Sequence, residues 1–325
     1  MNCLLSIRDL RTYFATDDGE ARAVDDVSFD LYEGETLGIV GESGCGKTAT
    51  ALSILRLIEH PGRIMEGSKI RYAGRNLLLL KPRDLRAIRG AEISMIFQEP
   101  ATSLNPVLTV GTQISETLRA HLDITRKDAR DRAVELLSMV GIAEPEKRVR
   151  YYPHELSGGM QQRVMIAMAL SCSPKILIAD EPTTALDVTI QAQILDLLLE
   201  LKQRLGMAMI LITHDLGIVA GVADRVAVMY AGRLVEHAPT KRLFESPEHP
   251  YTRALLRAIP RLDQPVDRLA VIPGSVPPAT DWPPACRFHP RCSRAWELCS
   301  SKEPELESID PGHQSRCWLA QRAEP

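Results

Sequence analysis

The sequence predicts an α/β fold with a phosphate-binding core, an inserted helical subdomain and a small cysteine-rich C-terminal extension. Strand-like runs flank a glycine-rich loop near residue 41, helical periodicity dominates residues 99–160, and prolines and four cysteines gather after residue 260. A chain of 325 residues is long enough for more than one domain. We predict a nucleotide-binding domain at residues 1–238, with the helical subdomain at about 99–160, and an extension at residues 239–325.

Composition narrows the class of protein. The chain has 39 basic and 42 acidic residues and a formal net charge of −3, so its charge indicates no general attraction to nucleic acid or anionic lipid. No apolar run approaches the roughly 18 residues of a membrane-spanning helix, and the N-terminal residues lack the pattern of a signal peptide. We therefore expect a cytosolic protein unless a partner holds it at a membrane.

The segment at residues 41–48 reads G-E-S-G-C-G-K-T and lies between a strand-like run at 36–40 and a helix-like run at 49–55. Glycines let successive N–H groups point at phosphate oxygens, and the following helix adds its positive end. Lys47 can reach the β- and γ-phosphates, and the Thr48 hydroxyl can ligate Mg²⁺. A simple glycine-rich turn is the alternative. The residues expected to bind nucleotide here are Gly41, Ser43, Gly44, Cys45, Gly46, Lys47 and Thr48.

Two further strand ends carry candidate catalytic residues. The apolar run at 176–179 leads into Asp180 and Glu181, and α/β sheets bind ligands at the carboxyl ends of their strands. Asp180 could hold Mg²⁺ through water while Glu181 polarises the attacking water; otherwise both acids only cap the turn before Pro182. His214 follows the run at 207–213 and could bond a γ-phosphate, or it is a structural residue.

A second phosphate-binding helix start is predicted near residue 157. Ser157 precedes Gly158 and Gly159 and begins an apolar helix that extends to about residue 171. Two glycines at a helix start leave N–H groups facing outward. On an early strand, the ring of Phe14 could stack on an adenine, although Tyr13 could do the same and ordinary core packing explains either ring equally well.

Four cysteines in the last forty residues follow the spacing C-x5-C-x6-C-x17-C. This spacing matches neither zinc fingers nor bacterial ferredoxins. It predicts four thiolates of a metal site, with unliganded buried cysteines as the alternative and with His289 and His313 as possible substitute ligands. The cysteines are Cys286, Cys292, Cys299 and Cys317. A separate hypothesis makes Cys45 a redox sensor, which requires a thiol of low pKa.

The order of these motifs resembles the nucleotide-binding subunit of an ABC transporter, over essentially the whole chain. The motifs are the loop at 41–48, Gln98, L-S-G-G-M at 156–160, Asp180-Glu181, A-L-D at 185–187 and His214. The resemblance implies an ABC ATPase core whose domains pair head to tail, so that Ser157, Gly158 and Gly159 face the ATP of the other domain. Met160 stands where the family has Gln.

The resemblance also implies roles for single residues. Glu181 would be the general base and His214 the γ-phosphate switch. Gln98 would sense the nucleotide, couple to the membrane partner and, with Thr48 and Asp180, hold Mg²⁺. Asp187 would contact the opposite subunit.

Three other segments resemble the oligopeptide/dipeptide importer branch, in the subunit type with a four-cysteine extension: F-Q-E-P at 97–100, H-P-Y-T at 249–252 and C-R-F-H-P-R-C at 286–292. This resemblance implies ATP and Mg²⁺ as cofactors, and it favours a [4Fe–4S] cluster over zinc. The implied partners are a second homologous ATPase subunit, two permease subunits and an extracytoplasmic peptide-binding protein, at the cytoplasmic face of the bacterial inner membrane. Alternatives are a soluble ABC-type ATPase acting on nucleic acid or ribosomes, and an importer of another solute such as a metal chelate.

Overall fold

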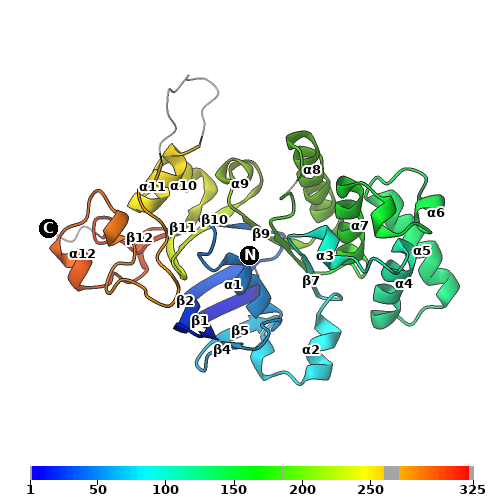
Figure 1. Ribbon diagram of the computed structural model, residues 1–325, viewed down its shortest axis with the longest axis horizontal. Coiled ribbons are helices and arrows are strands. Elements are labelled where there is room, and N and C mark those ends of the chain that lie inside the picture. Colours follow the sequence, from blue (N-terminus) through cyan, green and yellow to red (C-terminus); the bar gives the residue numbers. More distant parts are fainter. Residues whose placement is uncertain (1, 185, 260–270, 322–325) are drawn as a thin grey trace. The chain divides into compact units, whose positions relative to one another are not determined.

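The computed structural model describes residues 2–184, 186–259 and 271–321 (Figure 1). The chain forms two compact units: residues 1–78 together with 211–325, and residues 79–210. Each unit has a hydrophobic core cluster of its own. Among the described residues, no helix has both the length and the apolar character needed to cross a membrane.

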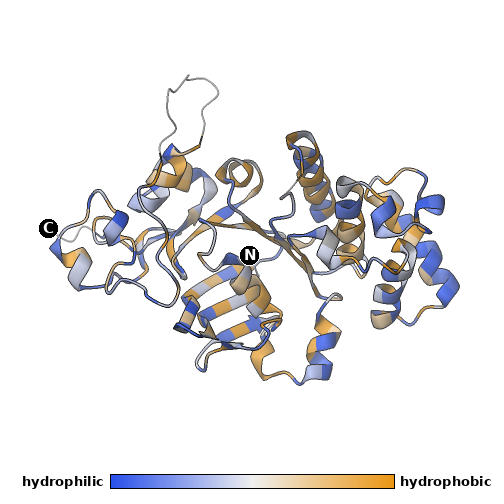
Figure 2. Ribbon diagram, viewed as in Figure 1, coloured by the Kyte–Doolittle hydropathy of each residue, from blue (hydrophilic) through white to orange (hydrophobic). Residues whose placement is uncertain are grey.

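The first unit begins with an antiparallel sheet in which the long strands β1 (Cys3–Thr16) and β2 (Gly19–Tyr32) pair. The order is β2-β1-β5-β6, with β4 (Gly62–Ile64) on β1, β5 at Lys69–Tyr72 and β6 at Arg75–Asn76. Figure 2 shows hydrophobic and hydrophilic residues alternating along these strands, and Leu5 and Ile7 are fully buried. The alternation is typical of a sheet with one face against a core.

The first unit also contains the strand that leads into the glycine-rich loop at residues 41–48. β3 (Thr36–Val40) is buried along its whole length and pairs in parallel with β10 (Arg225–Tyr230). β10 turns into antiparallel β11 (Arg233–Pro239), so the two strands form a hairpin. The sequence did not predict the next neighbours, β13 (His313–Ser315) on β11 and β12 (Glu307–Asp310) on β13. The end of the chain therefore extends this sheet.

Mostly short helices complete the first unit. α1 (Lys47–Ile54) starts at the end of the glycine-rich loop, and α9 (Leu216–Val222) follows the strand β9 (Ala208–Thr213), which runs across the boundary of the two units. The others are α10 (Thr240–Glu245), α11 (Pro250–Arg257), the 3-10 turn η3 (His289–Arg291) and α12 (Glu297–Ser301).

The second unit combines a parallel strand pair with a helical cluster. β7 (Ile93–Ile96) and β8 (Ile176–Asp180) are fully buried and pair in parallel, as their apolar sequences predict. Helices α4 (Val110–His121), α5 (Arg126–Met139) and α7 (Gly158–Leu170) share one hydrophobic core with α8 (Val188–Leu205). Shorter elements are the 3-10 turn η1 (Leu77–Leu79) at the unit boundary, α2 (Pro82–Ile88), α3 (Pro100–Ser103), α6 (Pro145–Arg148) and η2 (Pro153–Glu155).

Side chains cap two helices of the second unit, and the helix start predicted at Ser157 is confirmed. Thr125 accepts a hydrogen bond from the Asp128 N–H and begins α5, and Ser157 accepts one from the Met160 N–H and begins α7. Each cap satisfies a backbone donor that the helix itself leaves without a partner.

Candidate nucleotide-binding site

Two positions of the loop after β3, Gly41 and Gly46, have backbone angles and close neighbours that exclude any residue with a Cβ atom. Gly41 has φ 155°, and a Cβ there would lie 2.2 Å from the Met229 carbonyl oxygen. Gly46 has φ 104°, and a Cβ there would lie 2.2 Å from the Ala23 carbonyl oxygen. The neighbouring backbone therefore holds the loop tightly, as expected of a loop whose N–H groups serve a ligand.

Lys47 is the first residue of α1 and its side chain lies against this loop. The residue is 5% exposed, and its Nζ donates hydrogen bonds to the carbonyl oxygens of Gly41 at 2.8 Å and Glu42 at 3.1 Å. Both of these partners are neutral, so they leave the positive charge uncompensated. This arrangement places a positive charge beside the loop, where it could bind the oxygens of an anionic ligand.

Cys45 does not have the character that the redox hypothesis requires. The thiol is fully buried and lies 3.8 Å from the Lys47 ammonium group. Burial raises the pKa of Cys45, and the nearby positive charge of Lys47 opposes this only in part. A buried thiol with a raised pKa lacks the exposed, low-pKa character of a redox sensor, which argues against that hypothesis for Cys45.

Two residues of the C-terminal region support the loop, and sequence reasoning missed both. The hydroxyl of Tyr251 accepts a hydrogen bond from the Glu42 N–H at 3.0 Å, and Arg291 pairs with the Glu42 carboxylate at 2.8 Å. Both residues lie in segments that resemble the importer branch, Tyr251 in H-P-Y-T and Arg291 in C-R-F-H-P-R-C. Neither segment carries a sequence signal for a contact with the loop.

In the second unit, the carboxyl end of β8 carries the two predicted acids. Asp180 is 1% exposed. Glu181 has φ 45° and accepts hydrogen bonds from Gln98 Nε2 at 3.2 Å and Thr184 Oγ1 at 2.9 Å. A left-handed backbone is strained for a glutamate, and such strain concentrates at functional sites. The structure thus brings the predicted Gln98 and Glu181 side chains together.

The start of α7 is tied to the segment that follows these acids. Gln162 Nε2 donates a hydrogen bond to the Pro182 carbonyl oxygen at 2.6 Å. Gly158 is exposed, and a Cβ on Gly159 would lie 3.1 Å from Ile190 Cγ2, on α8. The side chain of Asp187 caps α8 by accepting the Ile190 N–H at 3.0 Å. The start of α7, the start of α8 and the segment after β8, which carry the predicted residues of this unit, therefore contact one another.

The other predicted residues lie in the first unit. Ser43, Gly44 and Thr48 are exposed around the start of α1, and His214 is exposed between β9 and α9. Phe14 is half-buried on β1 with its ring against Gly62, where a Cβ would lie 2.5 Å from Phe14 Cε1. The neighbouring Tyr13 donates its hydroxyl proton to Asp25 at 2.7 Å.

Comparison with known proteins decides the family. Residues 24–184 match the family model described as "ABC transporter", and residues 235–299 match "Oligopeptide/dipeptide transporter, C-terminal region". The chain is 52% identical over 320 residues to the oligopeptide transport ATP-binding protein AppD of Bacillus subtilis (strain 168), covering 98% of this chain and 97% of AppD. It is 50% identical over 314 residues to the dipeptide transport ATP-binding protein DppD of Escherichia coli (strain K12), covering 97% and 96%.

The chain belongs to the oligopeptide/dipeptide ABC transporter ATP-binding proteins. It is an ABC transporter ATPase for peptide import. Its fold is similar to a solved dimeric structure of the ATP-binding cassette MJ0796 bound to ADP and Pi, with a TM-score of 0.65 and 27% identity over 73% of this chain and 99% of that one. CbiO1 from Clostridium perfringens has a TM-score of 0.63 and 27% identity, covering 76% and 92%.

In this ABC ATPase, the four C-terminal cysteines belong to the first unit. Cys299 and Cys317 are buried, Cys286 and Cys292 are half-buried, and the Cys286 N–H donates to the Cys299 carbonyl oxygen at 3.1 Å. Burial and, to a smaller extent, the other three thiols raise the pKa of Cys286 to about 12. Nevertheless, within the described ranges no three or more His, Cys, Asp or Glu side chains are arranged so that they could hold a metal ion.

Proposed function

We propose that this ATPase binds Mg-ATP in the loop at residues 41–48 and hydrolyses it to energise the import of di- and oligopeptides. The observation that carries the ATP part is the buried Lys47 ammonium group, which backbone carbonyl groups hold against the loop. At two positions of this loop, Gly41 and Gly46, the surrounding backbone leaves no room for a side chain. The match of residues 235–299 to the oligopeptide/dipeptide transporter C-terminal region supports the peptide part.

In this proposal, the chemistry is positioning and electrostatic stabilisation. Bound Mg²⁺ would neutralise phosphate charge, and Thr48, Asp180 and Gln98 would hold it. Glu181 would orient the attacking water and accept its proton, while His214 would bond the γ-phosphate and Phe14 would stack on the adenine. The phosphates would be held by Gly41, Ser43, Gly44, Cys45, Gly46 and Lys47. The hydrogen bond between Gln98 and Glu181 supports a shared role for these two side chains.

We also propose that the ATP site is completed by a second ATPase subunit. Ser157, Gly158 and Gly159 would contact the ATP of that subunit, and Asp187 would lie at the interface. The two exposed residues at the start of α7, Ser157 and Gly158, are consistent with this role. The wider assembly would contain two permease subunits and an extracytoplasmic peptide-binding protein, with this chain peripheral on the cytoplasmic face of the inner membrane.

We further propose the domain division 1–238 and 239–325, with a helical subdomain at about 99–160, and a [4Fe–4S] cluster on the four C-terminal cysteines, with zinc as the alternative metal. The proposal rests on the four cysteines themselves and on the resemblance of residues 286–292 to the importer branch, since the described side chains are not arranged as a metal site. Because burial raises the pKa of Cys286 and Cys317, metal binding would have to release their protons.

Reconstitution tests the main proposal. The chain alone should bind Mg-ATP and hydrolyse it slowly, since half of each site must come from a partner subunit. Proteoliposomes that also contain the permeases and the partner ATPase should take up labelled short peptides in an ATP-dependent manner. Lys47→Ala in this chain should abolish uptake, whereas Lys69→Ala, an exposed change on β5, should not. Uptake of other solutes but of no peptide would contradict the substrate class.

A further inference from the structure

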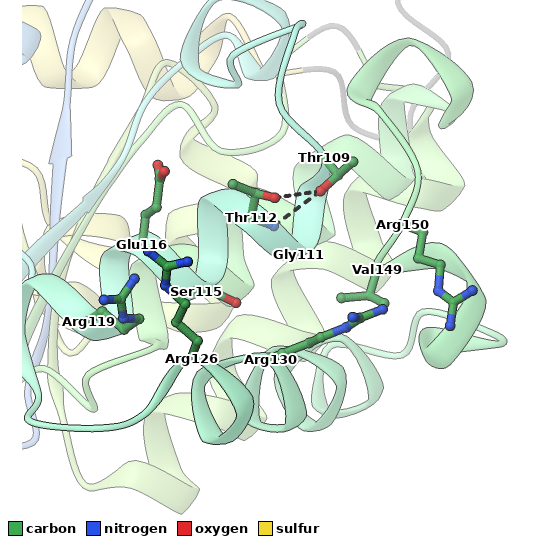
Figure 3. Close-up of a pocket in the computed structure, with 10 residues that line it drawn as sticks. All are labelled: Thr109, Gly111, Thr112, Ser115, Glu116, Arg119, Arg126, Arg130, Val149 and Arg150. Atoms are coloured by element: carbon green, nitrogen blue, oxygen red, sulfur yellow. Dashed lines mark hydrogen bonds between the residues drawn. The ribbon is translucent and has the colours of Figure 1, made fainter.

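The second unit contains a cavity of about 500 Å³ that none of the proposed ATP-site residues line. Helices α4 and α5 and the chain around Val149 form its walls (Figure 3). Four arginines line it and no lysine does, and Glu116 is the one acidic side chain among the lining residues. The arginines are Arg119, Arg126, Arg130 and Arg150. The lining therefore carries three more positive charges than negative ones.

These arginines have no structural partner that would explain them. All four are exposed, and none forms an ion pair or side-chain hydrogen bond with any residue in the described parts of the chain. Other basic residues nearby are paired: Arg132 with Glu135 at 2.6 Å, and Arg148 with Glu144 at 4.0 Å. The cavity thus gathers four guanidinium groups that have no ion-pair partner among the described residues.

Two of the arginines are also placed against the preference of their own helix. Arg126 is the first residue of α5 and Arg130 lies one turn later on the same face. A cation in the first turn of a helix opposes the helix dipole, and like charges four residues apart repel each other. Figure 3 shows the Arg126 side chain extending from α5 toward α4 and the Arg130 side chain extending toward Val149. An anionic ligand between them would remove both penalties.

We propose that this cavity binds a small ligand that carries several phosphate groups. Guanidinium groups match the oxygens of phosphate with paired hydrogen bonds, which distinguishes arginine from lysine as a recognition group. The hydroxyls of Thr112 and Ser115 supply further donors from α4, and the Glu116 carboxylate can accept a hydrogen bond from a hydroxyl or amino group of the same ligand. The volume is within the usual range of small-molecule sites, about 300–1,000 Å³.

The backbone N–H groups at the start of α4 are not available to bind a ligand in this cavity. The N–H groups of Val110 and Gly111 donate to the carbonyl oxygens of Tyr151 and Val149, at 2.9 and 2.8 Å. The Thr112 N–H donates to the Thr109 cap at 3.3 Å. Because these donors already have partners, recognition in this cavity falls to the side chains.

The lining favours a small polyanion over a segment of another protein. Protein interfaces have an apolar core with a polar rim. Here Val149 is the one large apolar side chain among the lining residues, and it is largely buried. The phosphate groups themselves could belong to a free metabolite or to the headgroup of an anionic lipid.

Ligand binding in this cavity would affect the position of α7, because α4, α5 and α7 share one core. The apolar faces of α4 and α5 contribute Ile114, Leu118 and Ala133 to the core cluster that also contains Val164 and Met165 of α7. Since α7 begins at Ser157, a ligand that draws α4 and α5 together acts on the helix that we propose to contact ATP of the partner subunit.

Binding of inorganic tripolyphosphate to the full-length chain tests the site. The Lys47→Ala background removes the competing affinity of the loop at 41–48, and calorimetry without Mg²⁺ at low ionic strength should then detect one site per chain. Arg126→Gln with Arg130→Gln should weaken this binding by about tenfold or more. Ser115→Glu, which adds a negative charge to the cavity and removes none of the arginines, should weaken it as well.

Arg132→Gln is the matched control, because it removes the same charge from α5 outside the cavity and should leave binding unchanged. Vesicles of cardiolipin, whose headgroup carries two phosphates, and phosphatidylcholine identify the source of the phosphate. Arginine-dependent vesicle binding supports a lipid headgroup, and tripolyphosphate binding alone supports a free ligand. The proposal is overturned if no phosphate probe binds, or if Arg132→Gln weakens binding as much as the double variant does. It is also overturned if poly-glutamate alone binds in an arginine-dependent way, because that result would indicate an acidic segment of a partner protein.

Discussion

Arg291 holds the Glu42 carboxylate with both of its terminal nitrogens, Nη1 at 2.8 Å from Oε2 and Nη2 at 3.0 Å from Oε1. The two residues are 249 positions apart in the chain. The Arg291 side chain is 4% exposed, and its guanidinium carbon lies 5.7 Å from the centre of the Tyr230 ring. Such a paired, buried geometry is specific and strong. It joins the cysteine-containing C-terminal region to the phosphate-binding loop.

Replacing Arg291 should therefore weaken nucleotide binding. Arg291→Gln leaves Glu42 partly buried with fewer partners, and this loosens the loop beside Lys47. We expect ATP affinity to fall by about three- to tenfold and the free energy of unfolding by about 1–3 kcal/mol. The measurements are calorimetric ATP titration and urea unfolding. Arg294→Gln, an exposed change in the same segment, should affect neither, and equal effects of both variants would show that Arg291 has no special part.

Glu181 is the candidate base for ATP hydrolysis. In the assembled transporter, Glu181→Gln should lower turnover by about 10²–10⁴, because the variant cannot take the proton of the attacking water. The amide oxygen of the variant can still accept the hydrogen bond from Gln98, so ATP binding should persist. Steady-state hydrolysis and ATP binding on the same samples give both values. Glu200→Gln, on the exposed face of α8, is the control, and turnover near the parental rate would transfer the role to His214.

A buried histidine should make the stability of the protein depend on pH. His237 is 6% exposed, and its Nδ1 lies 3.4 Å from Gln314 Oε1. Burial, and then the positive charge of Arg225, lower its pKa to about 4. In the unfolded chain a histidine titrates near 6.5. Between these values the unfolded state binds more protons, so the free energy of unfolding falls as the pH decreases from about 6.5 to about 4.

For His237 this contribution is about 2 kcal/mol between pH 7 and pH 5. His237→Gln should therefore make the pH dependence of urea unfolding less steep in that range, whatever its effect at pH 7. The dependence should not vanish, because the pKa of the buried His249 is lowered in the same direction, also to about 4. His154→Gln, an exposed change, should leave the slope unchanged. An unaltered slope in His237→Gln would contradict the assignment.

The sequence predicted those features of the fold that have local signals. The Ser157 cap precedes an apolar helix, and Lys47 follows a strand and a glycine-rich loop, so both could be assigned from neighbours in the chain. The strand at His313–Ser315 could not be, because three residues carry no periodicity and its partner is β11, far away in sequence. The same holds within the site: Gln98 and Glu181 were each candidates, but their hydrogen bond and the left-handed backbone of Glu181 depend on packing.

The C-terminal cysteines provide the last prediction, that they hold one [4Fe–4S] cluster with a structural role. Much of the region around them lacks long regular elements: α12 has five residues, and β12 and β13 have four and three. Such a segment gains little from burial to offset the entropy of ordering it, and four metal–thiolate bonds would close several loops at once. Protein purified without oxygen should be brown and contain about four irons per chain.

Cys299→Ser should remove the colour and the iron and lower the melting temperature. Cys172→Ser, which changes a half-buried cysteine of the other unit, should remove neither. ATP titration of the same samples separates a loosened C-terminal region from general unfolding, because a protein unfolded throughout would bind no ATP at all. One zinc per chain without iron would restore the zinc alternative. Protein that contains no metal after purification without oxygen, and that still melts above Cys299→Ser, would show that the four thiols act only as packed side chains.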